Sequence, residues 1–321
     1  MNVLLTGGAG FIGSHVAEGL VKRGDHVTVL DCFDNFYDPA IKRRTAARLT
    51  KLGVTFVEGD LRNVADVEKA FAAAGQGAGV IHLAARAGVR PSIAQPLLYS
   101  EVNVDGTTNM LEAARKAKAS RFVFASSSSV YGARSNAPFS EEDRIDRPVS
   151  PYAATKIAGE MLCATFAHLY GLETCALRFF TVYGPRQRPD LAIAKFARLI
   201  GRNEIVPFFG DGKTARDYTF VDDTARGVIA ALDHRWPQFE VLNLGGSRPV
   251  TLSALVSGIE KALGQKAKLD HQPDQPGDVP LTCAATEKAE RLLGWTATTP
   301  IDEGLARFAE WFKTGDADGW K

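Results

Sequence analysis

Short apolar runs alternate with longer stretches of mixed polarity through the first half of the chain. The apolar runs have the length of buried strands, and the stretches between them have the length and pattern of amphipathic helices. We expect strands at residues 3–6, 26–31, 54–58, 80–84, 121–125 and 174–179. We expect helices at residues 11–24, 39–52, 63–74, 95–118 and 151–170. This alternation predicts a parallel sheet with helices on both faces, which is the doubly wound α/β architecture.

The pattern changes after residue 181. Proline and glycine become frequent between residues 184 and 212, so we expect loops and short helices there rather than another strand and helix. Further elements are expected at 222–235 (helix), 240–244 (a strand that can rejoin the main sheet), 252–263 (helix) and 286–293 (helix). We therefore expect a large domain from residues 1–181 and about 220–247, and a smaller C-terminal lobe from about 182–219 and 248–321.

Composition narrows the class of protein only slightly. The chain has 321 residues, of which 45% are hydrophobic and 23% charged, so a large buried core is expected. A net charge of +1 indicates neither nucleic acid nor a membrane surface as a partner. The four cysteines form no C-x-x-C pair, so we expect no disulfide and no metal site, but reduced thiols in the cytoplasm. We expect no signal peptide, and no apolar run approaches the roughly 18 residues of a membrane span.

A glycine-rich loop, TGGAGFIG at residues 6–13, joins the first expected strand to the first expected helix. Gly7, Gly10 and Gly13 are evenly spaced, and glycine permits a tight turn in which the backbone approaches a pyrophosphate closely. The helix that follows offers unpaired N–H groups and the positive end of its dipole. At this place in an α/β chain, the loop predicts a Rossmann-type dinucleotide-binding domain.

Asp31 ends the second expected strand. A carboxylate at this point can accept hydrogen bonds from the adenosine ribose and would repel a 2′-phosphate, so it favours NAD over NADP. The basic run at residues 42–44 lies nearby and could meet a phosphate, although such a run is more often a solvated helix face.

Tyr152 and Lys156 lie four residues apart at the start of the helix expected at 151–170. Ser150 is a favourable N-cap and Pro151 a favourable first helical residue, so both side chains are expected on one helix face. A free tyrosine has a pKa of about 10 and is a poor base at neutral pH. A lysine ammonium and a nicotinamide cation close by would both favour the phenolate and lower that pKa. With the glycine loop, this pair predicts acid–base chemistry beside a nicotinamide.

Four consecutive serines at residues 126–129 follow the strand expected at 121–125. Ligands of open parallel sheets bind beyond the carboxyl ends of the strands. One of these hydroxyls could therefore bridge Tyr152 and a sugar hydroxyl, and the alternative is a plain serine-rich turn.

These residues together resemble the extended short-chain dehydrogenase/reductase family, and within it the nucleotide-sugar 4-epimerases. The resemblance covers essentially the whole chain. It rests on Asp31 and on the motifs TGGAGFIG at 6–13, HLAA at 82–85, NVDGT at 103–107, SSSSVYG at 126–132, YxxxK at 152–156, RFFTVYGP at 178–185 and RDY at 216–218. It implies tightly bound NAD, a catalytic hydroxyl at Ser127 and a nucleotide diphosphate in the smaller lobe.

The residue patterns and the resemblance together assign three groups of site residues. The residues expected to be catalytic are Ser127, Tyr152 and Lys156. The residues expected to bind NAD are Gly7, Gly10, Phe11, Ile12, Gly13, Asp31, Asp60, Leu61, Ala84, Ala85, Asn103, Tyr152, Lys156 and Phe179. The residues expected to bind a UDP-sugar are Ser127, Ser128, Ser129, Thr181, Arg188, Arg216 and Asp278. Family analogy also implies a homodimer formed through the helices near 95–118 and 151–170.

The residues after Ser127 separate the reactions of this family. Its dehydratases carry an Asp-Glu pair there to expel the C6 hydroxyl, and its UDP-glucuronate decarboxylases carry a Glu. This chain has Ser128 and Ser129, so the acid that would deliver a proton to a leaving hydroxyl is missing. Epimerisation through a 4-keto intermediate needs no such acid and is favoured, with dehydration or decarboxylation as the alternative.

The loop TVYGPRQRPD at 181–190 resembles that of UDP-glucuronate 4-epimerases, as do FYDP at 36–39 with Lys42 and QPGDVP at 275–280. A C6 carboxylate would suit hydroxyl donors from residues 127–129 and Thr181, with Arg188 close by. Cys32 departs from the family, where Asn is common after the ribose-binding Asp. The run PRQ at 185–187 also occurs in neutral-sugar epimerases, so a UDP-glucose 4-epimerase stays an alternative. A third reading is an NAD-binding sensor, against which the intact catalytic residues argue.

Overall fold

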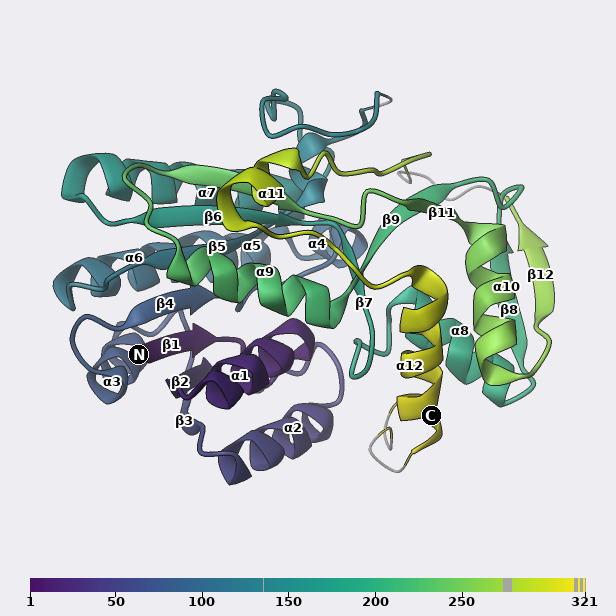
Figure 1. The fold of residues 1–321 in the computed structure, drawn as a ribbon, viewed down its shortest axis with the longest axis horizontal. Helices are drawn as coiled ribbons and strands as arrows, with labels where there is room; N and C mark the ends of the chain where they lie inside the picture. The colour runs from purple at the N-terminus through teal and green to yellow at the C-terminus, as the bar shows by residue number, and fades with distance from the viewer. Residues whose placement is uncertain (135, 274–278, 315–316, 318–319, 321) are drawn as a thin grey trace.

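The computed structural model describes the chain except for residues 135, 274–278, 315–316, 318–319 and 321. Its largest sheet has seven strands in the order β10-β6-β5-β4-β1-β2-β3 (Figure 1). The strands are β1 (Asn2–Thr6), β2 (His26–Asp31), β3 (Thr55–Glu58), β4 (Gly79–His82), β5 (Phe122–Ser127), β6 (Thr174–Phe179) and β10 (Glu240–Leu244). Every neighbouring pair is parallel, and the order from β3 to β6 is that of a Rossmann sheet, which confirms the predicted fold class.

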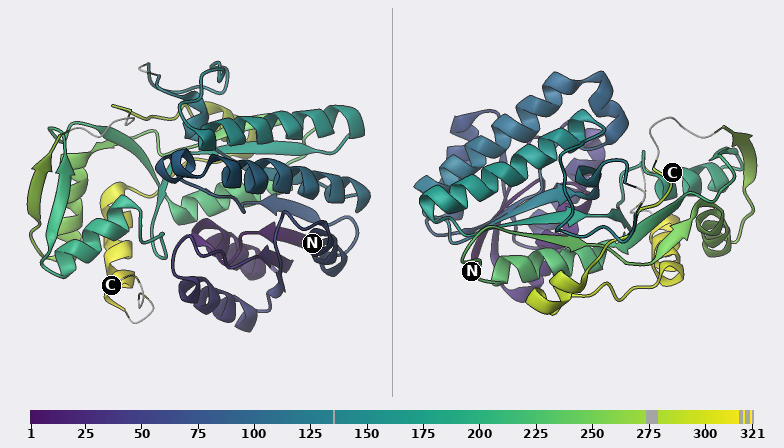
Figure 2. Two further views of the ribbon diagram at one scale, coloured as in Figure 1. Left: turned by 180° about the vertical axis from the view of Figure 1, so that it is seen from behind. Right: turned by 90° about the horizontal axis from the view of Figure 1, so that it is seen from above.

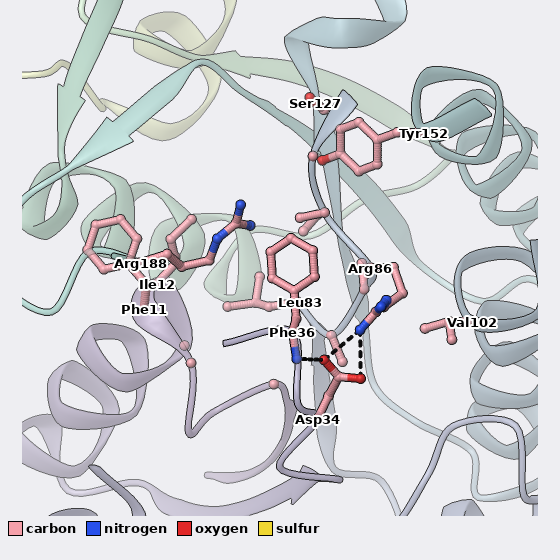
Figure 3. Close-up of a pocket in the computed structure, with 18 of the residues that line it drawn as sticks. Phe11, Ile12, Asp34, Phe36, Leu83, Arg86, Val102, Ser127, Tyr152 and Arg188 are labelled. Carbon is pink, nitrogen blue, oxygen red and sulfur yellow. Dashed lines mark hydrogen bonds and ion pairs between the residues drawn. The ribbon is translucent and has the colours of Figure 1, made fainter. Parts of the chain in front are cut away.

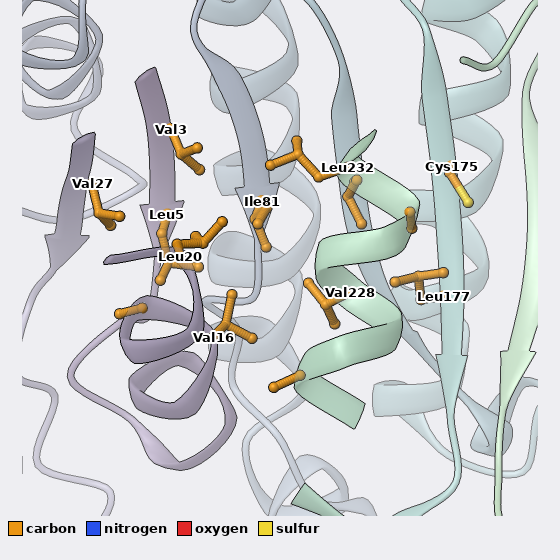
Figure 4. Close-up of a cluster of buried hydrophobic side chains, with 14 of the residues drawn as sticks. Val3, Leu5, Val16, Leu20, Val27, Ile81, Cys175, Leu177, Val228 and Leu232 are labelled. Carbon is orange, nitrogen blue, oxygen red and sulfur yellow. The ribbon is translucent and has the colours of Figure 1, made fainter. Parts of the chain in front are cut away.

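Helices cover both faces of this sheet (Figure 2). One face carries α1 (Phe11–Arg23), α2 (Pro39–Lys51), α9 (Val221–Asp233) and α11 (Glu287–Leu293). The other carries α3 (Val64–Ala74), α6 (Gly106–Lys116) and α7 (Pro151–Tyr170). Val3 and Leu5 of β1 pack with α1 and α9, as Figure 4 shows, whereas Leu4 between them joins the core of the other face. Because both faces are buried, the strands are almost continuously apolar.

The helix expected over 95–118 is interrupted. After α4 (Val89–Ala94), the chain forms α5 (Pro96–Ser100), a π-helical turn (Glu101–Asp105) and then α6. Asn103 in the π-helical turn is buried, and its side-chain amide donates to the Arg86 carbonyl and to Thr155 Oγ1, at 3.0 Å each. The wide turn therefore joins the loop after β4 to α7, a contact that no local pattern of hydrophobic residues could signal.

A smaller group of elements, which we call the small lobe, lies beyond the carboxyl ends of the large sheet (Figure 1). It has a three-stranded sheet of β7 (Thr181–Tyr183), β9 (Ala215–Phe220) and β11 (Pro249–Thr251). It also has a two-stranded sheet of β8 (Ile205–Phe209) and β12 (Lys268–Gln272). Its helices are α8 (Ala192–Gly201), α10 (Leu252–Leu263) and α12 (Ile301–Lys313).

The structure partly corrects the expectation of loops and short helices between residues 184 and 212: α8 is such a helix, but strand β8 also forms there. Pro207 lies within β8 and Gly210 follows it, so turn-forming residues conceal a strand of a two-stranded sheet. Helix α12 was also not expected. It packs with α8 and α10 in one apolar core that includes Ile193, Phe196, Ile200, Leu255, Leu305 and Phe308.

Strand β10 pairs with β6 in the large sheet, as predicted, although β9 and β11 lie in the small lobe. The chain therefore passes from the small lobe to the large sheet and back, which places the small lobe against the cavity described below. Among the described helices, none combines the length and the apolar character needed to cross a membrane.

Candidate active site

A cavity of about 550 Å³ opens at the carboxyl ends of the parallel strands, where ligands of such sheets bind (Figure 3). We call it the main cavity. The predicted residues that line it are Gly7, Gly10, Phe11, Ile12, Gly13, Asp31, Asp60, Leu61, Ala84, Ala85, Ser127, Ser128, Ser129, Tyr152, Lys156, Phe179, Thr181 and Arg188. Two predicted residues lie elsewhere, since Arg216 lines an adjoining cavity and Asn103 lies behind the wall. The predicted Asp278 falls outside the described residues.

The glycine loop at the base of the main cavity has no room for larger side chains. Gly7 has a φ of +73°, and a Cβ there would lie 2.9 Å from the Ala84 nitrogen. A Cβ on Gly13 would lie 2.2 Å from the Gly7 carbonyl oxygen. No side chain caps the first turn of α1, so its N–H groups are available to an anionic ligand. The loop therefore fits the pyrophosphate of a dinucleotide, on geometry as well as on spacing.

Asp31 anchors this loop from the end of β2. Its carboxylate accepts hydrogen bonds from the backbone N–H of Ala9 at 3.0 Å and of Phe33 at 2.9 Å. Burial raises the pKa of Asp31, while these hydrogen bonds and the charge of Lys42 oppose the rise. The buried carboxylate lines the main cavity, where it can also accept from a ligand hydroxyl.

The basic run at residues 42–44 is divided between two environments. Lys42 is buried and lines the main cavity, and its ammonium group donates to the Asp34 carbonyl at 2.8 Å. Arg43 instead pairs on the surface with Glu58, at 2.9 Å. The sequence-based interpretation of this run as one solvated face is therefore wrong for Lys42.

Tyr152 and Lys156 share one face of α7, as predicted. Ser150 caps the helix by accepting from the Ala153 N–H at 3.1 Å, and Pro151 is its first residue. The Lys156 ammonium is buried, donates to the Ala125 carbonyl at 2.7 Å and lies 5.9 Å from the centre of the Tyr152 ring. Burial lowers the pKa of Lys156 to about 8.

The Tyr152 phenol faces Ser127 across the upper part of the main cavity (Figure 3). Burial raises the pKa of Tyr152, and interactions with Ser127 and with the charge of Arg188 oppose that rise. The sequence argument expected Lys156 and a nicotinamide cation together to lower this pKa. In the protein alone, burial outweighs the nearby charge. Ser127 itself is held in place, because its Oγ accepts from the Ser129 N–H at 3.1 Å at the start of a 3₁₀ turn (Ser128–Tyr131).

The wall of the main cavity opposite Tyr152 and Ser127 carries Arg188 and three residues that were not assigned to the site from the sequence (Figure 3). These three are Asp34, Phe36 and Arg86. One guanidinium nitrogen of Arg86 donates to both carboxylate oxygens of Asp34, at 2.6 and 2.7 Å. The Phe36 ring lies between two cations, with the guanidinium carbon of Arg86 at 5.1 Å and that of Arg188 at 5.0 Å from its centre. Only Phe36 had a signal in the sequence, as part of the FYDP motif.

Arg188 is also paired with a neighbour on its own loop. Its Nε and one terminal nitrogen donate to the two oxygens of Asp190, at 3.0 and 2.7 Å. The arginine side chain is 17% exposed and the aspartate side chain 45%. The guanidinium group thus faces the main cavity while its partner faces solvent, so an incoming carboxylate could replace Asp190.

The loop that carries Arg188 contacts helix α1 on one side and Trp320 on the other. His15 on α1 hydrogen-bonds to the Pro185 carbonyl at 3.0 Å, and Arg186 pairs with Glu18 at 2.9 Å. Near the C-terminus, the buried Trp320 indole donates to the Gln187 carbonyl at 2.6 Å. The backbone of this loop is therefore held from two sides.

A second cavity of about 680 Å³ adjoins the main cavity and belongs to the small lobe. Thr181 and Leu191 line both cavities, so the two meet at β7. Its wall carries four cationic side chains and two acidic ones, namely Arg90, Lys195, Lys213, Arg216, Asp190 and Asp211. This excess of positive charge suits an anionic ligand, and it surrounds the predicted Arg216.

Asn103 and His82 support the main cavity from behind. The Asn103 oxygen accepts from the Arg86 N–H at 2.8 Å, so its amide fixes the loop after β4. His82 links Thr6 and Thr107, at 2.8 and 3.1 Å, and burial lowers its pKa to about 3. Both residues position backbone that lines the cavity, and direct contact of Asn103 with a cofactor stays a prediction.

A charged network lies directly beneath the serine-rich turn. Glu160 on α7 and Arg178 on β6 form two hydrogen bonds, at 2.8 and 2.9 Å, with side chains 0% and 4% exposed. Ser126 donates to the same carboxylate at 2.5 Å, and Arg178 donates to the Tyr131 hydroxyl at 3.0 Å. This buried network couples the end of β5, where Ser127 lies, to the helix that carries Tyr152 and Lys156.

Comparison with known proteins adds to this geometry. A model of the GDP-mannose 4,6 dehydratase family matches residues 4–308. UDP-glucuronate 4-epimerase 3 of Arabidopsis thaliana is 43% identical over 97% of this chain and 76% of its own length. The UDP-glucuronate 4-epimerase of Thermodesulfobacterium geofontis (strain OPF15) is 41% identical over 97% of this chain and 95% of its own.

Solved structures that share this fold include two UDP-sugar 4-epimerases. UDP-glucuronic acid 4-epimerase from Bacillus cereus, in complex with UDP-glucuronic acid and NAD, has a TM-score of 0.90 at 35% identity, covering 98% of this chain and 99% of that one. The UDP-glucose 4-epimerase of Thermus thermophilus, in complex with NAD, has a TM-score of 0.88 at 33% identity, covering 98% and 100%. The likeness therefore extends over both the large sheet and the small lobe.

Proposed function

Because this chain belongs to the GDP-mannose 4,6 dehydratase family and is related over nearly its whole length to UDP-glucuronate 4-epimerases, we propose that it is an NAD-dependent 4-epimerase that converts UDP-glucuronate to UDP-galacturonate. One arrangement carries this proposal. In the main cavity, the phenol of Tyr152 and the hydroxyl of Ser127 lie on one wall, and the guanidinium of Arg188 lies on another. An acid–base group and a carboxylate-binding group thus face the same space.

The main cavity fits NAD. The glycine loop and the open first turn of α1 would hold its pyrophosphate, and Asp31 would accept from the adenosine ribose. Asp60 and Leu61 would flank the adenine, with Ala84, Ala85 and Phe179 farther along the same cleft. When bound, NAD supplies a reversible hydride acceptor and, in its oxidised form, a positive charge near the phenol.

Tyr152 moves the proton. Its phenolate oxygen takes the proton from the C4 hydroxyl of the sugar and later returns it to the C4 oxygen. Ser127, already in contact with the phenol, hydrogen-bonds to the reacting hydroxyl. Lys156 keeps a positive charge beside Tyr152, and its anchor on the Ala125 carbonyl stops it from moving into the sugar site. Burial alone disfavours the phenolate. Positive charge from Lys156 and from the oxidised nicotinamide would favour it and make Tyr152 a usable base.

The remaining predicted residues select the sugar and its nucleotide. The hydroxyls of Ser128, Ser129 and Thr181, with Arg188, would bind the C6 carboxylate. Arg216 in the second cavity would bind the diphosphate, and Thr181 lies where the two cavities meet. The proposed nucleotide contact of Asp278 concerns a residue outside the described ones. No carboxyl group stands at 128–129, so proton delivery to a leaving C6 hydroxyl lacks an agent.

The decisive experiment is to incubate the purified protein with NAD and either UDP-glucuronate or UDP-glucose, and to separate the products by chromatography with mass detection. We expect UDP-galacturonate, unchanged in mass, as the main product. Faster conversion of UDP-glucose would favour the neutral-sugar epimerase, and loss of water or CO₂ would favour a dehydratase or decarboxylase. The control is Tyr152→Phe, which should lose most turnover while still retaining NAD when the nucleotide is extracted and measured. Near-normal turnover of that variant would contradict the assigned base.

A homodimer is the assembly that we propose with this function. Large apolar side chains are exposed on α4, α5 and α7, namely Ile93, Leu97, Met161, Leu169 and Tyr170. Exposed apolar groups on neighbouring helices are typical of a protein interface. Of these helices, α5 and α7 lie in the two segments that family analogy assigns to the dimer contact, and α4 directly precedes the first segment. Light scattering on the purified protein gives the molar mass that tests this. The cytoplasm is the proposed location, because all four cysteines are free.

A further inference from the structure

The Phe36 ring contacts two cationic side chains that line the main cavity. Its ring lies between Arg86 and Arg188, with guanidinium carbons at 5.1 and 5.0 Å from the ring centre (Figure 3). Both distances are within the range of an attractive cation–π contact, which stabilises a guanidinium group over an aromatic face. The ring therefore restricts where the Arg188 side chain can lie, independently of any substrate.

Phe36 is itself held firmly. Its backbone N–H donates to an Asp34 carboxylate oxygen at 2.7 Å, and Arg86 donates to both oxygens of that carboxylate. The Asp34 carbonyl accepts from the buried Lys42 ammonium at 2.8 Å. Because Asp34 is bonded through its side chain and its carbonyl, the short loop from β2 to α2 keeps the Phe36 ring at a fixed place on the cavity wall.

The same chain of contacts continues to the catalytic helix. The backbone of Arg86 exchanges two hydrogen bonds with the Asn103 amide, which also donates to Thr155. Thr155 is on α7, next to Lys156 in the sequence. An unbroken series of contacts therefore links α7 to Phe36, and through the ring to Arg188.

The remaining partner of Arg188 cannot hold it in this way. Asp190 is two residues away on the same loop, and its side chain is 45% exposed. An ion pair of this kind is weak in water and is readily exchanged. Without the Phe36 ring, Arg188 would keep only Asp190 of these two partners, and Asp190 moves with the same loop. It would lose the contact that fixes its position relative to the loop from β2 to α2.

We propose that Phe36, anchored by the Asp34–Arg86 ion pair, is a positioning residue that fixes Arg188 on the substrate carboxylate and so limits loss of CO₂ during epimerisation. The inference rests on the proposed function, because only a uronate has this carboxylate. It adds to that function a residue that controls which product forms but takes no part in proton or hydride transfer.

The chemical reason lies in the oxidised sugar. A uronate with a carbonyl at C4 is a β-keto acid. If the C5–C6 bond aligns with the carbonyl π orbital, that bond breaks, its electron pair forms an enolate across C4 and C5, and CO₂ leaves. Uptake of a proton at C5 then gives a 4-keto pentose, which is reduced at C4 to a UDP-pentose by the hydride removed earlier from the same carbon. A guanidinium group at a fixed place keeps the C5–C6 bond near the carbonyl plane, where this alignment is poor.

The test measures the ratio of UDP-pentose to UDP-galacturonate for Phe36→Leu, which keeps apolar bulk but removes the π face. We expect the ratio to rise by about 2- to 30-fold, the range that one cation–π contact can supply. Phe36→Tyr keeps the ring and should restore the ratio of the unmodified protein. The matched control is Phe33→Leu, because the Phe33 ring also carries a guanidinium, that of Arg43 at 4.4 Å, on the same loop but outside the main cavity.

The outcomes separate this inference from the proposed function. If the unmodified protein epimerises UDP-glucuronate and Phe36→Leu leaves the product ratio unchanged, the positioning role is wrong and the function stands. An equal rise in Phe33→Leu would also overturn it, because loop folding would then be the cause. If Phe36 acts through Arg188, adding Phe36→Leu to Arg188→Gln should raise the pentose fraction no further. A full additional rise in that double variant would contradict the inference.

Discussion

Two arginine–carboxylate pairs lie near the main cavity, one beneath the serine-rich turn and one on the opposite wall, and their geometries are almost the same. The hydrogen bonds of Arg178 with Glu160 measure 2.8 and 2.9 Å, and those of Arg188 with Asp190 measure 2.7 and 3.0 Å. Their surroundings differ completely. Both side chains of the first pair are buried, whereas the aspartate of the second is 45% exposed. Bond geometry therefore does not distinguish a structural ion pair from one that a substrate can open.

Desolvation explains the difference in role. Separating Arg178 from Glu160 would leave two charges without water or another counter-ion, so the pair is fixed once the protein has folded. Asp190 can turn into solvent at little cost, which leaves Arg188 free to bind another carboxylate. The fixed pair supports the serine-rich turn from below, and the arginine of the exchangeable pair faces the main cavity. The predictions that follow test this contrast.

The largest effect is expected on stability when the buried pair is broken. Glu160→Ala leaves Arg178 charged and buried and also removes the acceptor of Ser126, so the free energy of unfolding should fall by about 3–5 kcal/mol. Asp190→Ala, the matched variant, should change it by less than about 1 kcal/mol. Urea denaturation of the two variants measures both values. Equal losses would show that burial does not distinguish the pairs.

A loss of activity, without a comparable loss of stability, is expected when the exchangeable pair is broken at its arginine. Arg188→Gln should lower kcat/KM for UDP-glucuronate by about 10- to 150-fold, the size of a charged hydrogen bond to a carboxylate. The effect on UDP-glucose should be clearly smaller. The control is Arg186→Gln, because Arg186 is on the same loop but pairs with Glu18 away from the main cavity. Steady-state kinetics with both sugars measures these effects. An equal loss of kcat/KM for UDP-glucuronate and UDP-glucose in Arg188→Gln would contradict the assignment.

The smallest effects are expected in the pH profile of the NAD-bound enzyme, on opposite limbs. The charge of Arg188 lowers the pKa of Tyr152, so Arg188→Gln should raise that pKa and move the acidic limb to higher pH. Glu160 raises the pKa of Lys156, which burial has lowered to about 8, so Glu160→Gln should move the alkaline limb to lower pH.

Each of these shifts should be below about one pH unit, because more would require over ~1.4 kcal/mol from a single charge. Rates of UDP-glucuronate conversion across the pH range measure both limbs. A shift of either limb in the opposite direction would mean that Tyr152 or Lys156 is not the group that titrates there.

The sequence predicted the parts of the site that have local signals. The glycine loop, the N-cap at Ser150 and the four-residue spacing of Tyr152 and Lys156 each depend on neighbouring residues, and the structure has all of them as expected. The large sheet was predictable for the same reason, because its strands are buried on both faces and are almost continuously apolar. In this part of the molecule, the helix over 95–118 differed because of the inward turn at Asn103, and the short helix α4 before it was not expected.

The remainder depends on contacts between distant residues. Asp34 and Arg86 are 52 positions apart, and no spacing rule relates them. In the small lobe, Pro207 and Gly210 suggested loops, but pairing with β12 forms a strand around the proline. The extent to which burial raises the Tyr152 pKa in the protein alone was also beyond the sequence, because it depends on how deeply the phenol lies.

The hydrogen bond from the Trp320 indole to the Gln187 carbonyl ties the loop that carries Arg188 to a residue beyond α12. Trp320 also packs edge-to-face on Trp311 of α12, so this helix helps to fix its position. A substitution at Trp320 would therefore act on the backbone of the Arg188 loop while leaving every residue of the main cavity unchanged. For an engineer, Trp320 is a position outside the cavity from which variants of that loop can be sought.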